Sequence, residues 1–418
     1  MDEQLLAVAT PIFLISMIAE WLLNRWHLKR RGLSSATGGS GGYRLDDTLT
    51  DLACGIGQQL LDPLLRLVGV AAYAAVQQRW GLWQWDLHSP AHWVVAMILV
   101  DLGFYLFHRA SHRVRVLWAV HHVHHSSDEY NLAVALRQPW LEKLVDLPFY
   151  LPLALMGMPV ELYVSAFTLN LIYQFFLHTR WVPKLGPLEW LLNTPSHHRV
   201  HHGVNPQYID KNYGGMLVIW DRLFASFTPE AEAPVYGTVT PLRTWNVWTA
   251  NAAPWRELLH SSGLCGAWLD KLKIWLGPPE WRPAHLGGPL TIAEPDIRAR
   301  GWRELPVANA RRFAVAVLLY VGGLLAVLQQ VQSALGGPAL AVLAAAGLAL
   351  MAAAGAGLEG QKAARPLRIS AVLALGLAAP LLLGWHGLGL GLWSAATIAM
   401  VALGLAQDPP QKLAAAEV

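Results

Sequence analysis

Long apolar stretches separated by short polar segments run along most of the chain, and they predict membrane-spanning helices. The first, Leu5 to Leu23, is followed by basic residues, which predicts a retained helix whose C-terminal end is cytosolic. The second covers about residues 50–77, and it is long enough to cross with tilt or to begin along the interface. The third, residues 91–107, ends on His108.

A fourth apolar stretch, Leu147 to Leu177, is interrupted near its middle by Gly157 and Pro159. One straight span would place His178 on the opposite side of the membrane from the cluster of histidines between His108 and His125. Because those histidines form a single candidate site, we expect a helical hairpin that bends at Gly157–Pro159 and returns.

Four further apolar runs follow near residues 313–330, 338–357, 369–384 and 389–405. Basic residues fall on alternate connections and after the last run, which the positive-inside rule makes cytosolic. Within the second run, small side chains recur at every fourth position and favour close helix contact on one face. They are Ala345, Ala349, Ala353 and Gly357.

The predicted fold is an all-α integral membrane protein: transmembrane helices, a cytosolic helical cap that carries a histidine-rich di-metal site, and a C-terminal four-helix membrane domain. Residues 1–90 would form N-terminal membrane helices and a cytosolic loop, and 91–245 the catalytic domain. Residues 246–311 would be a cytosolic, membrane-adjacent linker, and 312–418 an accessory transmembrane domain.

Composition supports a membrane protein, since 54% of the 418 residues are hydrophobic and 14% are charged. Soluble domains carry roughly 25% charged residues. A net charge of +3 gives no reason to expect nucleic acid binding. Two cysteines exclude a thiolate metal cluster. The Ala-, Leu- and Gly-rich helices favour a bacterial inner membrane, or the endoplasmic reticulum in a eukaryote.

Histidine supplies the candidate chemistry, because eleven of the 17 histidines lie between His108 and His202. Imidazole is a common ligand of transition metals. Residues three or four apart share one face of a helix, so each histidine box can point several rings at one place. This spacing, with His178, selects nine candidate metal ligands: His108, His112, His121, His124, His125, His178, His198, His201 and His202.

Two other histidines in the boxes are less clear. His122 faces away from the predicted stripe and is expected to have a solvent or indirect role, while His197 lies four residues before His201 and is open as a tenth ligand. Metal-binding histidines usually donate their second N–H to a carboxylate or a carbonyl. Carboxylates available for this role include Asp101 and Asp128, with Glu129, Asp210 and Asp221.

Nine neutral imidazoles could hold two divalent metal ions and would leave them strongly positive. Carboxylate-bridged centres are built differently, from Glu-x-x-His pairs, and the boxes contain no such pair. The sequence lacks a Rossmann fingerprint, a P-loop and an iron–sulfur cluster motif. An oxygenase of this kind therefore needs O2 and an external electron donor as partners.

The histidine boxes resemble the fatty acid hydroxylase/sterol desaturase superfamily of membrane di-iron enzymes. The surrounding sequence resembles its alkylglycerol monooxygenase branch over about residues 95–245. The strings that carry the resemblance are HRASHRVRVLWAVHHVHHSSDEYNLAVALRQ (108–138), NLIYQFFLHT (170–179), GPLEWLLNTPSHHRVHHGVNPQYIDKNYGGMLVIWDRLFASF (186–227) and VYGTVTP (235–241).

The resemblance implies that the same nine histidines hold two iron ions. It implies oxidation of the ether-linked carbon of an alkylglycerol, to a hemiacetal that separates into a fatty aldehyde and glycerol. It also implies tetrahydrobiopterin as the reductant. The chain departs from the pattern at Arg113, where an acidic residue is typical, and at His122, where a glutamine is usual.

Several polar residues near the boxes are candidates for contact with a lipid head group or a pterin: Arg109, Asn131, Arg137, Asn193 and Tyr213. Each is also explained by salt bridges or loop hydrogen bonds.

The alternatives within the enzyme class are a fatty acid, sterol or carotenoid hydroxylase or desaturase with a protein electron donor. A metal transporter or store is the alternative from another class, as is a non-catalytic partner protein whose site has lapsed. The oligomeric state is left open.

Overall fold

The computed structural model describes residues 2–30, 43–291, 308–331, 334–361, 364–385 and 387–405. Within these ranges the chain is helical and has no strand, only one isolated antiparallel bridge between Leu192 and Leu217. Seven of the described helices are long and apolar enough to cross a membrane. The prediction of an all-α, multi-pass integral membrane protein is confirmed.

The chain forms two compact units, each assembled from separate stretches. The first comprises residues 1–44, 65–242 and 253–301, and the second comprises 45–64, 243–252 and 302–418. Two long helices, α2 (Leu45–Trp80) and α10 (Val247–Gly263), contribute residues to both units. The domain boundaries expected at residues 90, 245 and 311 stay predictions.

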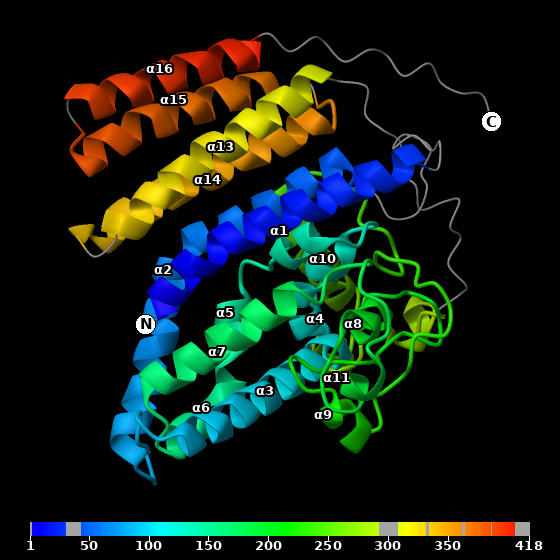
Figure 1. The fold of residues 1–418 in the computed structure, drawn as a ribbon. Helices are drawn as coiled ribbons and strands as arrows, with labels where there is room; N and C mark the ends of the chain where they lie inside the picture. The colour runs from blue at the N-terminus through cyan, green and yellow to red at the C-terminus, as the bar shows by residue number, and fades with distance from the viewer. Residues whose placement is uncertain are drawn as a thin grey trace. The chain divides into compact units, whose positions relative to one another are not determined.

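The first unit contains α1 (Asp2–Arg30), α3 (Pro90–Arg113) and the short helices that follow them (Figure 1). The expected hairpin is confirmed: α6 (Leu147–Leu155) and α7 (Val160–Phe175) both pack along α3 and are joined at Gly157. Gly157 has a φ of +79°, and a Cβ there would lie 2.0 Å from the Trp83 carbonyl oxygen. Only glycine fits this turn.

Shorter helices carry the rest of the first unit. They are α4 (Arg115–His121), α5 (Glu142–Val145), α8 (Pro195–His201), α9 (Ile219–Leu223), α11 (Trp268–Leu276), and the 3-10 turns η2 (His124–Ser126), η3 (Leu132–Leu136), η4 (Gly186–Trp190) and η5 (Ala284–Leu286).

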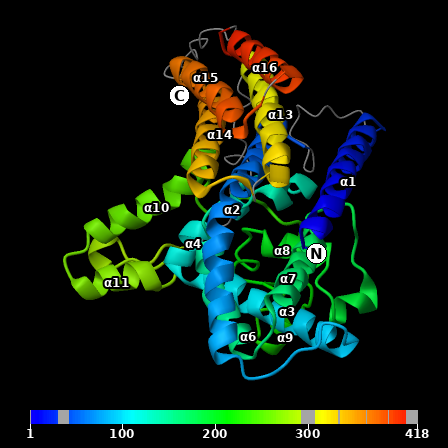
Figure 2. The same ribbon diagram turned by 90° about the vertical axis from the view of Figure 1, so that its left-hand side faces the viewer.

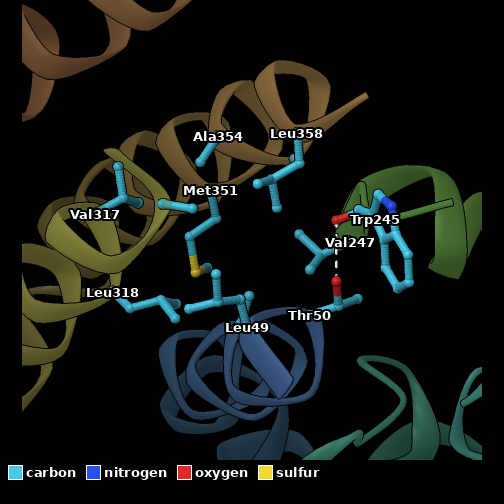
Figure 3. Close-up of a pocket in the computed structure, with 12 residues that line it drawn as sticks. Leu49, Thr50, Trp245, Val247, Val317, Leu318, Met351, Ala354 and Leu358 are labelled. Atoms are coloured by element: carbon cyan, nitrogen blue, oxygen red, sulfur yellow. Dashed lines mark hydrogen bonds between the residues drawn. The ribbon is translucent and has the colours of Figure 1, made fainter. Parts of the chain in front are cut away.

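The second unit holds the four expected C-terminal helices. They are α13 (Ala308–Val331), α14 (Gly337–Leu358), α15 (Ala364–Leu383) and α16 (Gly387–Leu405). Arg311 donates two hydrogen bonds of 2.7 Å to the Asp46 carboxylate at the start of α2. A small apolar pocket lies between α2, α13, α14 and the segment around Trp245 (Figure 3).

The expected small-residue stripe on α14 is met only in its second half. Ala353 and Gly357 are buried, whereas Ala345 and Ala349 are exposed. The closest approaches are made at two other glycines: a Cβ at Gly347 would lie 2.9 Å from the Leu60 side chain, and one at Gly355 would lie 2.5 Å from the Asn246 Cα.

Candidate metal centre

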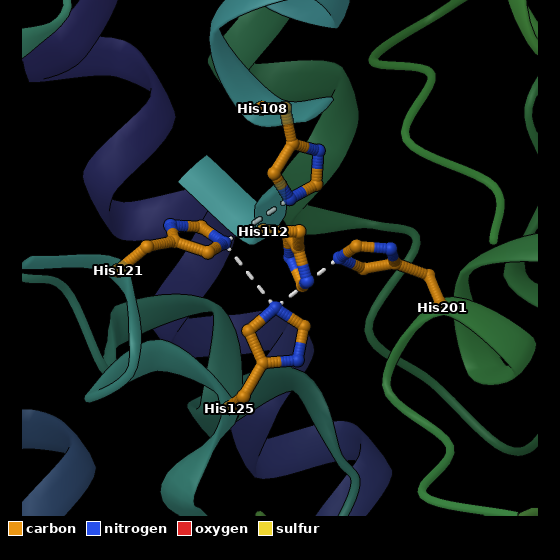
Figure 4. A group of neighbouring side chains, drawn as sticks. All are labelled: His108, His112, His121, His125 and His201. Atoms are coloured by element: carbon orange, nitrogen blue, oxygen red, sulfur yellow. Dashed lines mark hydrogen bonds between the residues drawn. The ribbon is translucent and has the colours of Figure 1, made fainter. Parts of the chain in front are cut away.

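Nine imidazoles converge within the first unit, and they divide into two groups. The five-histidine group contains His108, His112, His121, His125 and His201, and the four-histidine group contains His124, His178, His198 and His202. In each group the candidate ligand atoms all lie within 4.8 Å of one another. Figure 4 shows nitrogens of the five-histidine group turned toward a common centre. These are the nine that the spacing selected.

Neighbouring rings approach through their Nε2 atoms. In the five-histidine group the Nε2–Nε2 distances are 3.1 Å for His108–His121, 3.2 Å for His121–His125 and 3.2 Å for His125–His201. In the four-histidine group they are 3.4 Å for His124–His178, 3.1 Å for His178–His198 and 3.2 Å for His198–His202.

Backbone carbonyls determine which nitrogen of several rings carries the proton. In the four-histidine group, His124 Nδ1 lies 3.3 Å from the Arg137 carbonyl, and His178 Nδ1 lies 2.9 Å from the Gln174 carbonyl. If both Nδ1 atoms donate, both Nε2 atoms present lone pairs to each other at 3.4 Å. Two facing lone pairs repel, and a cation between them removes the conflict. This donor set therefore fits a metal ion.

Burial keeps these rings neutral, which is the form that binds metal. Desolvation, and then the charge of neighbouring histidines, lowers the pKa of His121, His125, His198, His201 and His202 well below 6.5. Burial lowers the pKa of His124 to about 4. The rings are consequently available as ligands at neutral pH.

One loop, residues 210–216, supports the five-histidine group. The Tyr213 carbonyl lies 2.9 Å from His108 Nδ1, and the Lys211 carbonyl lies 3.0 Å from His201 Nδ1. Asp210 and Asn212 have φ values of +60° and +55°, which turn these carbonyls toward the rings. The sequence shows this loop as DKNYGGM but gives no sign of its carbonyl contacts.

The expectation that carboxylates contact the ligand rings directly is corrected for two of them. The Asp101 carboxylate accepts hydrogen bonds from the Met216 and Leu217 amides and from Trp220 Nε1. Asp221 accepts from the Tyr213 and Gly214 amides, each at 2.8 Å. Both acids hold the loop that in turn holds the rings.

A carboxylate that sequence reasoning missed supports the four-histidine group. Glu20, in α1, is only 7% exposed. It accepts hydrogen bonds from the Leu132 amide at 2.8 Å and from the Thr179 hydroxyl, next to His178. Its signal in the sequence was a carboxylate within an apolar run, where an ionisable residue marks a specific partner.

Four of the five residues predicted to contact head group or pterin also hold loops by hydrogen bonds, and their contact with a ligand stays a prediction. The fully buried Arg137 donates to the Val123 carbonyl and the Ser126 hydroxyl, and Arg109 donates to the Tyr105 hydroxyl and the Phe224 carbonyl. Asn131 caps η3 through the Ala133 amide.

Asn193 donates to the Gly214 and Gly215 carbonyls. Tyr213 differs from these four, because its ring lies 5.3 Å from that of His112. Among the five candidates it is the one whose ring lies beside a histidine of the site.

The remaining predicted positions lie outside both groups of the described site. His197 is buried, with Nε2 3.8 Å from a Glu189 carboxylate oxygen. The ring of His122 packs 5.3 Å from that of Trp118. Asp128 is half-buried shortly after η2, and its indirect role stays a prediction.

The helical membrane architecture and the paired histidine groups together describe a multi-pass membrane protein with a candidate two-metal centre. Residues 93–226 match the family model described as fatty acid hydroxylase. The resemblance expected from the histidine boxes is confirmed, and the chain is a relative of the alkylglycerol monooxygenases.

Two such relatives cover most of the chain. The Homo sapiens protein is 43% identical over 302 residues, 72% of this chain and 65% of its own length. The Xenopus tropicalis protein is 38% identical over 288 residues, which are 68% of this chain and 62% of its own length. The ornithine lipid hydroxylase OlsE of Rhizobium tropici is 28% identical over 38% of this chain and 49% of its own. The chain thus spans less than two thirds of the length of each of these relatives. No solved structure matches.

Proposed function

We propose that this protein is a membrane-bound di-iron monooxygenase that hydroxylates a lipid C–H bond. The substrate we propose is an alkylglycerol, oxidised at its ether-linked carbon. The observation that carries the proposal is the division of nine buried, neutral imidazoles into two adjacent groups. The relatives named alkylglycerol monooxygenase support the choice of substrate.

The reaction consumes one O2, two electrons and two protons. One oxygen atom enters the C–H bond next to the ether oxygen, and the other leaves as water. The resulting hemiacetal separates into a fatty aldehyde and glycerol. Two iron ions, when bound by the nine histidines, would supply the activation of O2, for which protein side chains alone are not suited.

The residues of the chain hold the ligands and shape their surroundings. The carbonyls of Lys211 and Tyr213 orient rings of the five-histidine group, and those of Arg137 and Gln174 orient rings of the other. The Tyr130 and Tyr213 rings lie against histidines of the two groups and help to exclude water. Tyr213 is our candidate for contact with the lipid head group or the reductant.

The reductant in this proposal is tetrahydrobiopterin, supplied from outside the chain. The basic residues that follow the first apolar run place the site on the cytosolic side, in a bacterial inner membrane. Residues 91–245 form the catalytic domain in this proposal, and the family match at 93–226 falls inside it.

The decisive experiment supplies the purified, iron-loaded protein with an alkylglycerol, tetrahydrobiopterin and O2, and measures fatty aldehyde. We expect aldehyde and glycerol in equal amounts, with no product when any one component is omitted. Turnover of a fatty acid or sterol with a protein electron donor, and no aldehyde, would replace this proposal by the other lipid oxygenase function.

A further inference from the structure

The helix α11 exposes apolar side chains where a helix in water exposes polar ones. Trp268, Leu269, Leu272 and Leu276 are 69%, 60%, 47% and 57% exposed. At 3.6 residues per turn these four positions lie on one side of the helix. In the described part of the chain, this apolar face is left uncovered.

The opposite side of α11 is fixed against the protein. Ile274 is fully buried, in a cluster with Ala119 of α4 and Cys265. At the edge of the apolar face, about two turns after Trp268, Trp275 donates from its indole nitrogen to the Ser262 hydroxyl, 3.1 Å away. Because these contacts hold the helix, its apolar face cannot turn inward. Figure 2 shows α11 beside the end of α10.

Two lysines border the apolar face, one on each side. Lys271 and Lys273 are both exposed, and Lys273 Nζ lies 4.5 Å from the centre of the Trp281 ring. Lysines at such a border bury their methylene stems along apolar surface while the ammonium groups stay with water or lipid phosphates. This arrangement is typical of a helix that lies in a membrane interface.

The backbone also relates α11 to the end of a membrane span. The Arg115 amide donates to the Gly277 carbonyl, directly after α11, at 2.9 Å. The candidate span of α3 ends at Arg113, two residues before Arg115. The C-terminal end of α11 therefore lies where α3 leaves the bilayer, which favours lipid over a soluble partner as the occupant of the apolar face.

We propose that α11 is an interfacial membrane anchor, with Trp268, Leu269, Leu272 and Leu276 inserted among the lipid head groups and the first acyl carbons. Such helices insert about 5–10 Å into this layer. Since Ile274 packs on α4, the anchor supports the helix that carries His121 from the membrane side. The proposal needs no catalytic activity, so it stands or fails separately from the proposed reaction.

The test uses the full-length protein in lipid nanodiscs, with Cys54→Ala and Cys265→Ala as the background. A fluorophore is attached at Leu272→Cys, and the matched control carries it at Lys271→Cys on the polar edge. We expect nitroxide-labelled lipid to quench the probe at 272 more strongly than the one at 271, and aqueous iodide to do the reverse. Iodide quenching at 272, or protection from both quenchers, would overturn the proposal.

A second comparison guards against a probe that perturbs the helix. With the fluorophore at Leu276→Cys, the pair Leu269→Asn and Leu272→Asn should abolish lipid quenching, whereas Lys271→Asn should preserve it. Metal content verifies that each variant is folded. Equal lipid quenching in both variants would show that Leu269 and Leu272 do not hold the helix in lipid, and would overturn the proposal.

Discussion

The five-histidine and four-histidine groups are supported by different parts of the chain. In the first, two rings donate to one loop, residues 210–216, which Asp101 and Asp221 hold in place. In the second, the rings donate to carbonyls of their own neighbouring segments, and α1 joins through Glu20. The residues that support the five-histidine group all lie within 93–226, the stretch that matches the fatty acid hydroxylase family model. The four-histidine group is also supported by Glu20, which lies outside that stretch. Similar ligand sets can therefore depend on different elements.

The largest effect should come from removing one ligand in each group. His201→Ala and His124→Ala should each lose about one metal ion per chain and lower activity by at least ~100-fold, since even indirect ligand contacts affect metal sites by 10–100-fold. Elemental analysis of the purified variants measures the stoichiometry. Two metals retained in both variants would show that these groups are not the metal sites, and would return the transporter alternative to consideration.

A sharper comparison removes the supporting carboxylates instead of the ligands. In a His124→Ala background, which leaves the five-histidine group intact, Asp221→Asn should weaken the remaining metal by roughly 10–100-fold and Glu20→Gln should not. In a His201→Ala background the order should reverse. Chelator competition provides the measurement. If each carboxylate affected both backgrounds equally, the separate support of the two groups would be disproved.

Both groups should make the metal-free protein sensitive to acid. Histidines of each group have a folded-state pKa lowered below 6.5 by burial, so the unfolded chain takes up protons first. Their contribution to stability is complete above pH 6.5 and is lost as the pH falls below it, with each pKa unit worth about 1.4 kcal/mol per group. Melting temperatures between pH 8 and pH 5 measure this loss. An unchanged melting temperature would contradict burial of the neutral rings.

The smallest effect should come from His122, which lies between His121 and His124 in the sequence. His122 packs on Trp118 and belongs to neither group, so His122→Gln should keep both metals and change stability by only about 1 kcal/mol. Metal content and melting temperature test this against His121→Gln, which should lose a ligand. Loss of metal in His122→Gln would show that His122 contributes to the centre.

Helical spacing predicted which nine histidines meet but not how they divide. A continuous helix would have placed His121, His124 and His125 on one face. Instead α4 ends at His121 and a 3-10 turn begins at His124, so His124 joins the second group while His121 and His125 stay in the first. The break depends on buried contacts such as that of Arg137 with the Val123 carbonyl, which span 14 positions in the chain.

The supporting contacts were predicted less well than the ligands. Carboxylates near the boxes were expected to contact the rings, but four rings contact backbone carbonyls, which every residue possesses and which no sequence pattern distinguishes. The hairpin was predicted correctly, because the requirement that His178 return to the other histidines allowed one arrangement. The contact face of α14 was predicted only in part, since many small residues in that helix fit several registers.

Because the turn at Gly157 fixes where α7 begins, the length of α7 determines where His178 lies. The hairpin is held at that end by hydrogen bonds from the Leu82 amide to the Leu155 carbonyl and from Trp85 Nε1 to the Met156 carbonyl, each 2.9 Å long. From there α7 runs to the turn that carries His178. Inserting one residue into α7 would rotate its far end by about 100° and advance it about 1.5 Å. His178 would then miss the four-histidine group although every histidine was still present. The length of α7, and not ligand identity alone, thus determines whether this centre can assemble.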